Sequence, residues 1–150
     1  MVFDANLVLC DGSYDWTFAR LVTSNYGSPT SLTRNSGGFV VLDLAALGGT
    51  PATGIGIVLI LDDDAAVGTL TAIVQSCDAL DFAAAVHELA RFDLAAANSG
   101  VLLGSEAPCT VIRRVATTDR YLRVDCSLSG GADDLLTGYI LVSPWAFATL

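Results

Sequence analysis

Five aspartates of this 150-residue chain lie beside the ends of two apolar runs, and their carboxylates are the first groups with possible chemistry. Asp62, Asp63 and Asp64 follow one run, and Asp78 and Asp81 flank the end of the next. Calcium binds about six to eight oxygen ligands. A hairpin of the two runs would gather Asp62, Asp63, Asp64 and Asp78 into a candidate cation site. The segment DDDAAVG lacks the alternating ligands and the glutamate of a calcium loop, so a solvated turn is the preferred interpretation. We expect no metal and no cofactor.

His87 is the only histidine, so any mechanism that needs an imidazole depends on it. It would act as a general base only if a distant Ser or Cys folded onto it, and the chain has no GxSxG motif to frame a nucleophile. The glycines near position 50 form no GxGxxG, and a GK[ST] phosphate loop is impossible without lysine. We predict a non-enzyme with an ordinary strand histidine, and keep a small hydrolase built around His87 as an alternative.

All seven basic residues are arginine, and four of them lie between positions 113 and 123. Arg113 and Arg114 must point to opposite sides of a strand, and Arg123 falls on the polar face of another. These arginines either balance the charge of an acidic surface or dock onto an acidic partner, because guanidinium pairs bidentately with carboxylates. Arg113, Arg114 and Arg123 are therefore candidate partner contacts.

Aromatic residues outside the apolar runs supply the other candidate contacts. Trp16, Phe18 and Tyr26 lie in the long polar segment 16–38, which has the character of a contact arm. Trp145 and Phe147 lie in the apolar tail 144–150, which must pack on its own core or across a subunit boundary.

Composition excludes several classes of protein. The formal charge of −9 argues against nucleic acid as a partner. The hydrophobic fraction is 53% and the charged fraction 15%, which leaves apolar surface for subunit contacts and favours an oligomer. The start has no basic n-region, and the longest apolar run, 57–61, is far shorter than a membrane span, so we expect a soluble protein made in the cytoplasm. The four scattered cysteines predict reduced and partly buried thiols.

Short apolar runs separated by turn residues predict one all-β domain over residues 1–150, an antiparallel sandwich or barrel. The run at 86–95 also has helix propensity, but the all-β context favours a strand. Alternation puts Leu122, Val124 and Cys126 on the core face of the run 120–128, and the run 135–143 has the pattern of a strand covered on both sides. Together these last two runs predict a β-hairpin with its turn at 129–134. The eight predicted strands are 5–11, 39–44, 55–62, 69–77, 86–95, 110–115, 120–128 and 135–143.

In their order, these segments resemble the jelly-roll capsid cement, or decoration, proteins of tailed bacteriophages. The resemblance rests on LVLCDG (7–12), VVLDLAALG (40–48), GIGIVLIL (54–61), GTLTAIVQSCD (68–78), HELARFDLAAAN (87–98) and DRYLRVDCSLSGG (119–131). These motifs are structural and include no catalytic residue, and segment 16–38 is longer than its counterpart in such proteins.

The resemblance implies a β-sandwich of jelly-roll type with about eight strands. It also implies a homotrimer on the outer capsid surface of the virion, which binds the major capsid protein and stabilises contacts between its subunits. We expect neither a membrane nor a nucleic acid as partner. A jelly-roll carbohydrate- or calcium-dependent binding module is the alternative, with Asp62 to Asp64, Asp78 and a surface aromatic as its site.

Overall fold

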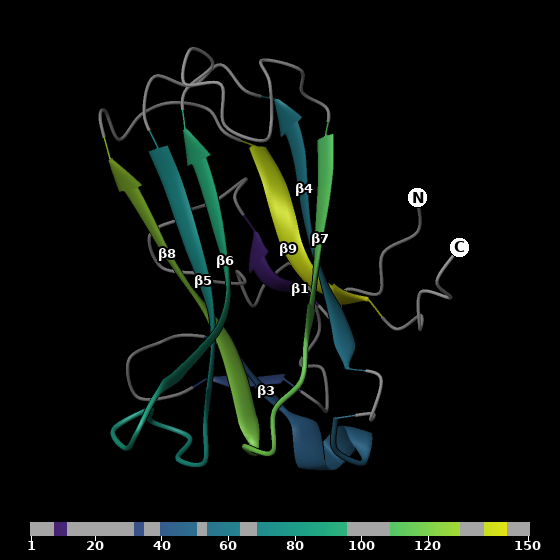
Figure 1. Ribbon diagram of the computed structural model, residues 1–150, viewed down its shortest axis with the longest axis vertical. Helices are drawn as coiled ribbons and strands as arrows, with labels where there is room; N and C mark the ends of the chain where they lie inside the picture. The colour runs from purple at the N-terminus through teal and green to yellow at the C-terminus, as the bar shows by residue number, and fades with distance from the viewer. Residues whose placement is uncertain are drawn as a thin grey trace.

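The structure is a computed structural model that describes residues 8–11, 32–34, 40–50, 54–63, 69–95, 109–129 and 137–143. These residues form an all-β fold with one short 3₁₀ helix (Figure 1). The elements are β1 (Val8–Asp11), β2 (Leu32–Arg34), β3 (Val40–Asp43), η3 (Leu44–Leu47), β4 (Ile55–Asp63), β5 (Thr69–Cys77), β6 (His87–Ala95), β7 (Cys109–Val115), β8 (Tyr121–Ser129) and β9 (Thr137–Ser143). No helix in this part of the chain has the length and hydropathy of a membrane span.

The strands form two antiparallel sheets. One sheet has four strands in the order β1-β9-β4-β7, and the other has five in the order β2-β3-β8-β5-β6. Every pairing is antiparallel, and most neighbours in a sheet are far apart in the sequence. The fold therefore depends on long-range pairing rather than on local turns.

The two sheets share one core, to which each contributes alternate residues. Strands β4 and β9 supply Ile57, Leu59, Ile140 and Val142, and the opposite sheet supplies a set that includes Phe92. Burial of each such side chain contributes about 1.5 to 3 kcal/mol. The core residues contributed by the five-stranded sheet and η3 are Leu42, Leu44, Ala72, Val74, Phe92, Leu122, Val124 and Cys126.

A smaller apolar cluster lies on the other face of the five-stranded sheet. Val41 of β3, Cys77 of β5 and Phe82 of the β5–β6 loop are buried there, against Ala79 and Tyr121. Phe82 has a φ of +56°, which is unusual for a residue with a side chain. The loop thus folds back over its own sheet and covers one end of it.

The eight strands predicted from the sequence are all present, with ends that differ by up to three residues. The choice of strand over helix at 86–95 is confirmed, because β6 pairs with β5 from His87 to Ala95. Two elements were not predicted. Strand β2 lies inside segment 16–38, and η3 directly follows β3.

The predicted hairpin of the last two strands is wrong. Strand β8 pairs with β3 and β5, whereas β9 pairs with β1 and β4 in the other sheet. The alternation of apolar residues identifies the face that a strand buries, but it contains no information about the neighbouring strand. Here both edges of each strand are taken by partners that are distant in the sequence.

The predicted faces of these two strands are confirmed. Leu122, Val124 and Cys126 of β8 are buried, and the residues between them are more exposed. In β9 all four residues from Ile140 to Ser143 are buried, as expected for a strand that is covered on both sides. The thiols of Cys77 and Cys126 are buried and form no disulfide, and the side chains of Cys10 and Cys109 lie outside those described.

Candidate functional site

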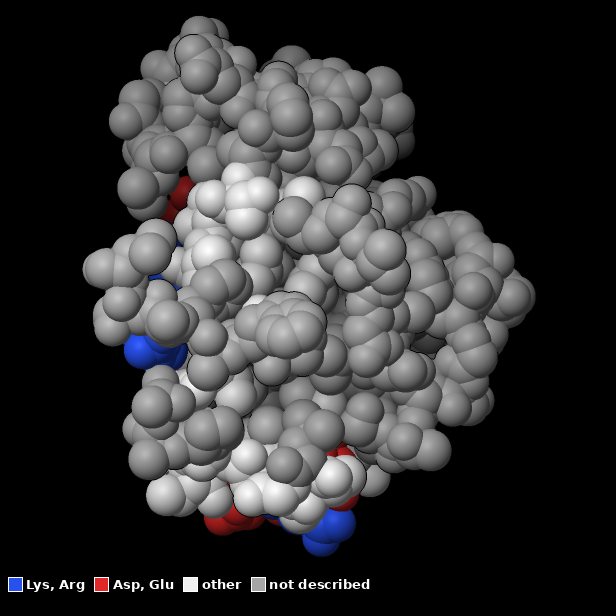
Figure 2. Space-filling view, turned by 90° about the vertical axis from the view of Figure 1, so that its right-hand side faces the viewer, with Lys and Arg blue, Asp and Glu red and all other residues white. Residues whose placement is uncertain are grey.

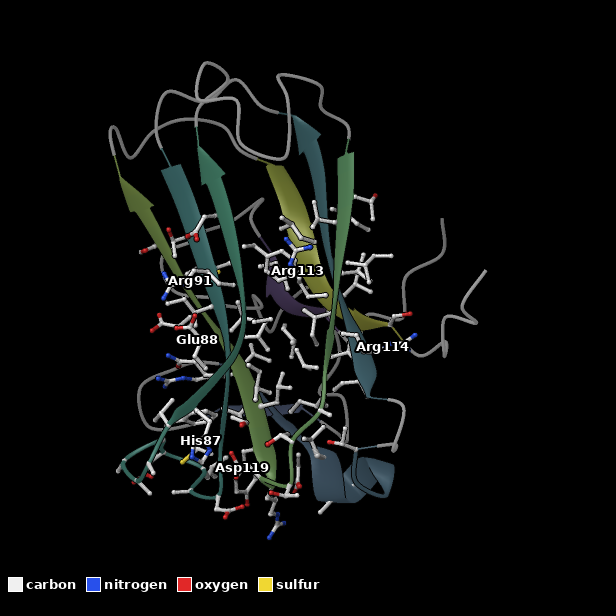
Figure 3. The ribbon with its side chains drawn as sticks, viewed as in Figure 1. His87, Glu88, Arg91, Arg113, Arg114 and Asp119 are labelled. Carbon is white, nitrogen blue, oxygen red and sulfur yellow. The ribbon has the colours of Figure 1, made fainter. Side chains whose placement is uncertain are left out.

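A polar cluster lies at the end of the molecule where β5 ends and β6 begins. The carboxylate of Asp119 accepts a hydrogen bond from the Ser76 hydroxyl (2.6 Å) and lies 2.8 Å from Nδ1 of His87. The hydroxyls of Ser76 and Thr117 are 3.0 Å apart, and Thr117 Oγ1 also accepts the backbone N–H of Asp119 (3.1 Å). Figure 3 shows His87 and Asp119 side by side at this end. The cluster joins β5, β6 and the turn between β7 and β8.

A β-bulge in β6 decides which side chain faces this cluster. Val74 is opposite Ala90, but Gln75 is opposite Glu88, so Leu89 is the extra residue. His87 therefore lies opposite the buried Ser76, and Glu88 turns to the other face of the sheet. Without the extra residue, period-two alternation would place Glu88 at this position.

The charges of the cluster stabilise one another. The hydrogen bond to Asp119 raises the pKa of His87, with smaller contributions from the charges of Asp119 and Asp78. The same contact with His87 lowers the pKa of Asp119, and the Ser76 hydroxyl lowers it further. The His87 side chain is 60% exposed and that of Asp119 is 10% exposed. The ring therefore meets solvent while its carboxylate partner is nearly enclosed.

The order of these groups does not match a nucleophilic site. In a serine hydrolase the hydroxyl gives its proton to the imidazole, which a carboxylate orients from its other side. Here Asp119 stands between the other two groups, and the fully buried Ser76 donates to the carboxylate. The cluster therefore holds no nucleophile–base pair at His87.

Two of the aspartates proposed as a cation site, Asp63 and Asp78, lie at opposite ends of the described sheets. Asp63 ends β4 at the upper end of Figure 1, whereas Asp78 follows β5 at the lower end. Asp78 accepts a hydrogen bond from the backbone N–H of Arg120 (3.0 Å). The side chains of Asp62 and Asp63 and the whole of Asp64 lie outside the described residues. In the described part of the chain, no three His, Cys, Asp or Glu residues are grouped so as to hold a metal ion.

The arginines proposed as partner contacts are dispersed. Arg113 lies opposite the core residue Ile57, and its guanidinium is 5.6 Å from the ring centroid of Phe92. Arg114 points to the other side of β7, as the sequence predicted (Figure 3). On the five-stranded sheet, Arg123 donates to Gln75 (2.8 Å) and lies 4.2 Å from the Phe82 centroid. Partial burial lowers the pKa of Arg123. Trp16, Phe18, Tyr26, Trp145 and Phe147 lie outside the described residues.

A second polar group lies on the exposed face of β6, pointing away from the core in Figure 3. Arg91 donates two hydrogen bonds to Glu88 (3.0 and 2.9 Å), and Thr71 donates to Asp93 (3.0 Å). Exposed pairs of this kind contribute little to stability, because water screens them. They identify this face as a polar surface.

Ser76, Thr117 and Asp119 were not among the residues predicted to form a site. One signal was present for Ser76, since alternation along residues 69–77 aligns it with the core residues Ala72 and Val74. A polar residue in a core position needs a hydrogen-bond partner, but the sequence does not identify it. The turn residues Thr117 and Asp119 carry no such signal.

Comparisons of the chain with family models, curated proteins and solved structures find no match.

Proposed function

We propose that this chain is a capsid cement protein of jelly-roll type, which binds as a homotrimer to the outer surface of an assembled phage head. In this role it stabilises the contacts between subunits of the major capsid protein. The proposal combines the sequence resemblance with the order of the strands and the character of the surface.

The strand order is the observation that carries the proposal. When the short β2 is set aside, the other eight strands form four antiparallel pairs: β1 with β9, β3 with β8, β4 with β7, and β5 with β6. Each pair is nested inside the previous one along the chain. Two four-stranded sheets built from nested pairs support the jelly roll that the resemblance implies.

The four-stranded sheet has an apolar centre. The central residues of β4 and β9 are buried on both faces of the sheet, among them Val58, Ile60 and Leu141. Figure 2 views the side of the molecule on which this sheet lies, and the described residues visible there are mostly uncharged, with red and blue atoms at the left margin and lower end. A cement protein acts through many copies of a modest interface, and a sheet whose centre is buried on both faces can serve as the body that carries the contact segments.

The proposed capsid contacts are the aromatic segments 16–38 and 144–150. Arg113 and Arg123 make their contacts within the chain, on Phe92 and Phe82, which favours a structural role for them. Arg114 also has an interaction within the chain, and its exposed position on the outward side of β7 keeps it as a proposed contact.

Three measurements test the function. Light scattering after gel filtration should give the mass of a trimer. Co-sedimentation with phage heads assembled from a candidate major capsid protein should show binding to expanded heads and not to unexpanded ones. Because cement binds only the assembled state, saturated heads should also melt at a higher temperature. A monomer that does not sediment with expanded heads would overturn the proposal.

Variants in the proposed contacts sharpen the test. The double variant Trp145→Ala and Phe147→Ala should lose binding to expanded heads, whereas Glu88→Gln, on the polar face of β6, should bind as the parent does. Equal binding by both variants would show that the tail 144–150 does not contact the capsid.

A further inference from the structure

The loop between β5 and β6 is closed at its base by the polar cluster. Ser76 lies two residues before the loop, His87 directly follows it, and the two residues are opposite each other in the β5–β6 register. The loop presents the exposed side chains of Leu80 and Val86 and buries Phe82 against the sheet. Whatever holds His87 in place therefore also fixes the end of this loop.

Asp119 connects the base of the loop to a separate part of the chain. Its carboxylate, in the turn between β7 and β8, contacts both the Ser76 hydroxyl and the His87 imidazole. Thr117 of the same turn contacts Ser76. The turn is thus joined to both strands that bound the loop. Its contact with β6 is made through the exposed imidazole of His87, whereas its contacts with β5 are made through the buried Ser76.

We propose that His87 is a pH-sensitive latch that fastens the β5–β6 loop to the β7–β8 turn through the carboxylate of Asp119. The latch consists of His87, Asp119, Ser76 and Thr117. It does not depend on the proposed function.

The charges around His87 favour its cationic form. Asp119 and Asp78, from the turn and from the end of β5, are the two carboxylates that act on it. The other charged groups nearby have partners of their own. Arg120 of the turn is paired with Asp43, and Glu88 of β6 is paired with Arg91 on the opposite face. Asp81 in the loop accepts the backbone N–H of Ala83.

The direction of the pH effect follows from these contacts. Asp119 raises the pKa of His87 above its ordinary value of 6.5. The ion pair is therefore complete in weakly acidic solution and is lost as the pH rises through the raised pKa. Above that point the neutral ring retains a hydrogen bond to Asp119 without the charge. The carboxylates of Asp119 and Asp78 then face an uncharged imidazole, and the loss of this attraction weakens the attachment of the loop.

Nuclear magnetic resonance on the whole chain tests the latch. In the parent protein the imidazole resonances of His87 should titrate above 6.5, and the amide resonances of Leu80 and Val86 should follow the same curve. Asp119→Asn should remove most of the upward shift of the His87 pKa, because Asp119 is its main cause and Asp78 contributes less. Glu88→Gln is the matched control, because it removes the neighbouring carboxylate on the other face and should leave the titration unchanged.

The parent protein alone also tests the proposal, should Asp119→Asn fail to fold. Hydrogen exchange of the loop amides, corrected for intrinsic rates, should lose protection as the pH rises through the His87 titration, while amides in the centre of β4 keep theirs. The proposal is overturned by a His87 pKa at or below 6.5, by loop amides that do not follow His87, or by an Asp119→Asn variant in which His87 titrates as it does in the parent.

Discussion

Arg120 and Asp43, which are 77 positions apart in the sequence, form a bidentate contact between two parts of the chain. Nε and Nη2 of Arg120 donate to the two carboxylate oxygens of Asp43 at 3.1 and 2.8 Å. Asp43 also accepts the N–H of Ala45 (3.0 Å) at the start of η3, and the carbonyl of Arg120 accepts the N–H of Leu44 (2.8 Å). One carboxylate therefore both caps η3 and joins it to the β7–β8 turn.

Substitutions of Asp43 separate these two roles. Asp43→Ala removes the cap and the ion pair, and should lower the free energy of unfolding by about 1 kcal/mol. Asp43→Asn keeps an oxygen for Ala45 and loses the charge, so its loss should be smaller. Urea denaturation at pH 7 compares the two variants, and equal losses would show that the cap contributes nothing.

The stabilisation by Asp43 should depend on pH in the acid range. Arg120 lowers the pKa of Asp43 below its ordinary value of 3.8. The carboxylate therefore contributes fully above that value, and its contribution is lost as the pH falls through the lowered pKa of the folded state. The difference in stability between the parent and Asp43→Asn should shrink in the same range. A difference that is constant from pH 7 to pH 2 would contradict the role of the ion pair.

Two glycines in left-handed conformations provide a matched pair. A Cβ atom on Gly54 (φ +76°) would lie 2.7 Å from the carbonyl oxygen of Val115, whereas one on Gly49 (φ +89°) would meet nothing within 4 Å. Gly49→Ala should therefore cost only the backbone strain, about 1 kcal/mol. Gly54→Ala should cost about 2 to 3 kcal/mol, because the backbone of β7 must also move. Thermal unfolding of the two variants measures the difference, and equal losses would contradict the close approach of Gly54 to β7.

The sequence predicts the strands and the faces of this fold because both are local properties. Leu122 and Val124 alternate with more polar residues, and this pattern alone identifies the buried face of β8. The pairing of β8 and β9 with other strands is not local, since each strand has two edges and several apolar runs are possible neighbours. The turn residues between the two strands therefore led to the wrong hairpin.

The polar cluster was beyond prediction for a related reason. It depends on the extra residue at Leu89, which shifts the register so that His87 rather than Glu88 faces Ser76. The sequence around Leu89 contains no glycine or proline to indicate a bulge. Asp119 reaches the cluster only because β7 and β8 lie in different sheets and their connecting turn passes this end of the molecule.

Arg113 should keep β7 from pairing with another copy of the chain. Strand β7 is an edge strand, and Arg113 points from it toward the core beside Phe92. An inward-pointing charge on an edge strand opposes the docking of a further strand, since the charge would then be buried. Arg113→Leu should therefore form assemblies larger than those of the parent at high concentration, whereas Arg113→Lys keeps the charge and should not. Light scattering over a concentration series measures the size of the assemblies. If Arg113→Leu behaved as the parent does, this role of Arg113 would be contradicted.

Phe82 combines a strained backbone with a buried ring, and two substitutions separate these effects. Its φ is +56°, its ring packs on Val41 and Cys77, and the guanidinium of Arg123 lies 4.2 Å from the ring centroid. Phe82→Ala loses the packing but keeps the strain, and should lower the free energy of unfolding by about 3 kcal/mol. Phe82→Gly loses the same packing and also relieves the strain.

Glycine should therefore be the better replacement at this position, although it is usually worse than alanine within regular structure. We expect Phe82→Gly to be more stable than Phe82→Ala by about 1 kcal/mol, because the left-handed backbone is strained for alanine and unstrained for glycine. Denaturation of the two variants under the same conditions measures the difference directly. If alanine were the more stable, the loop would not hold the left-handed conformation in solution, and Phe82 would reach its cluster by another backbone path.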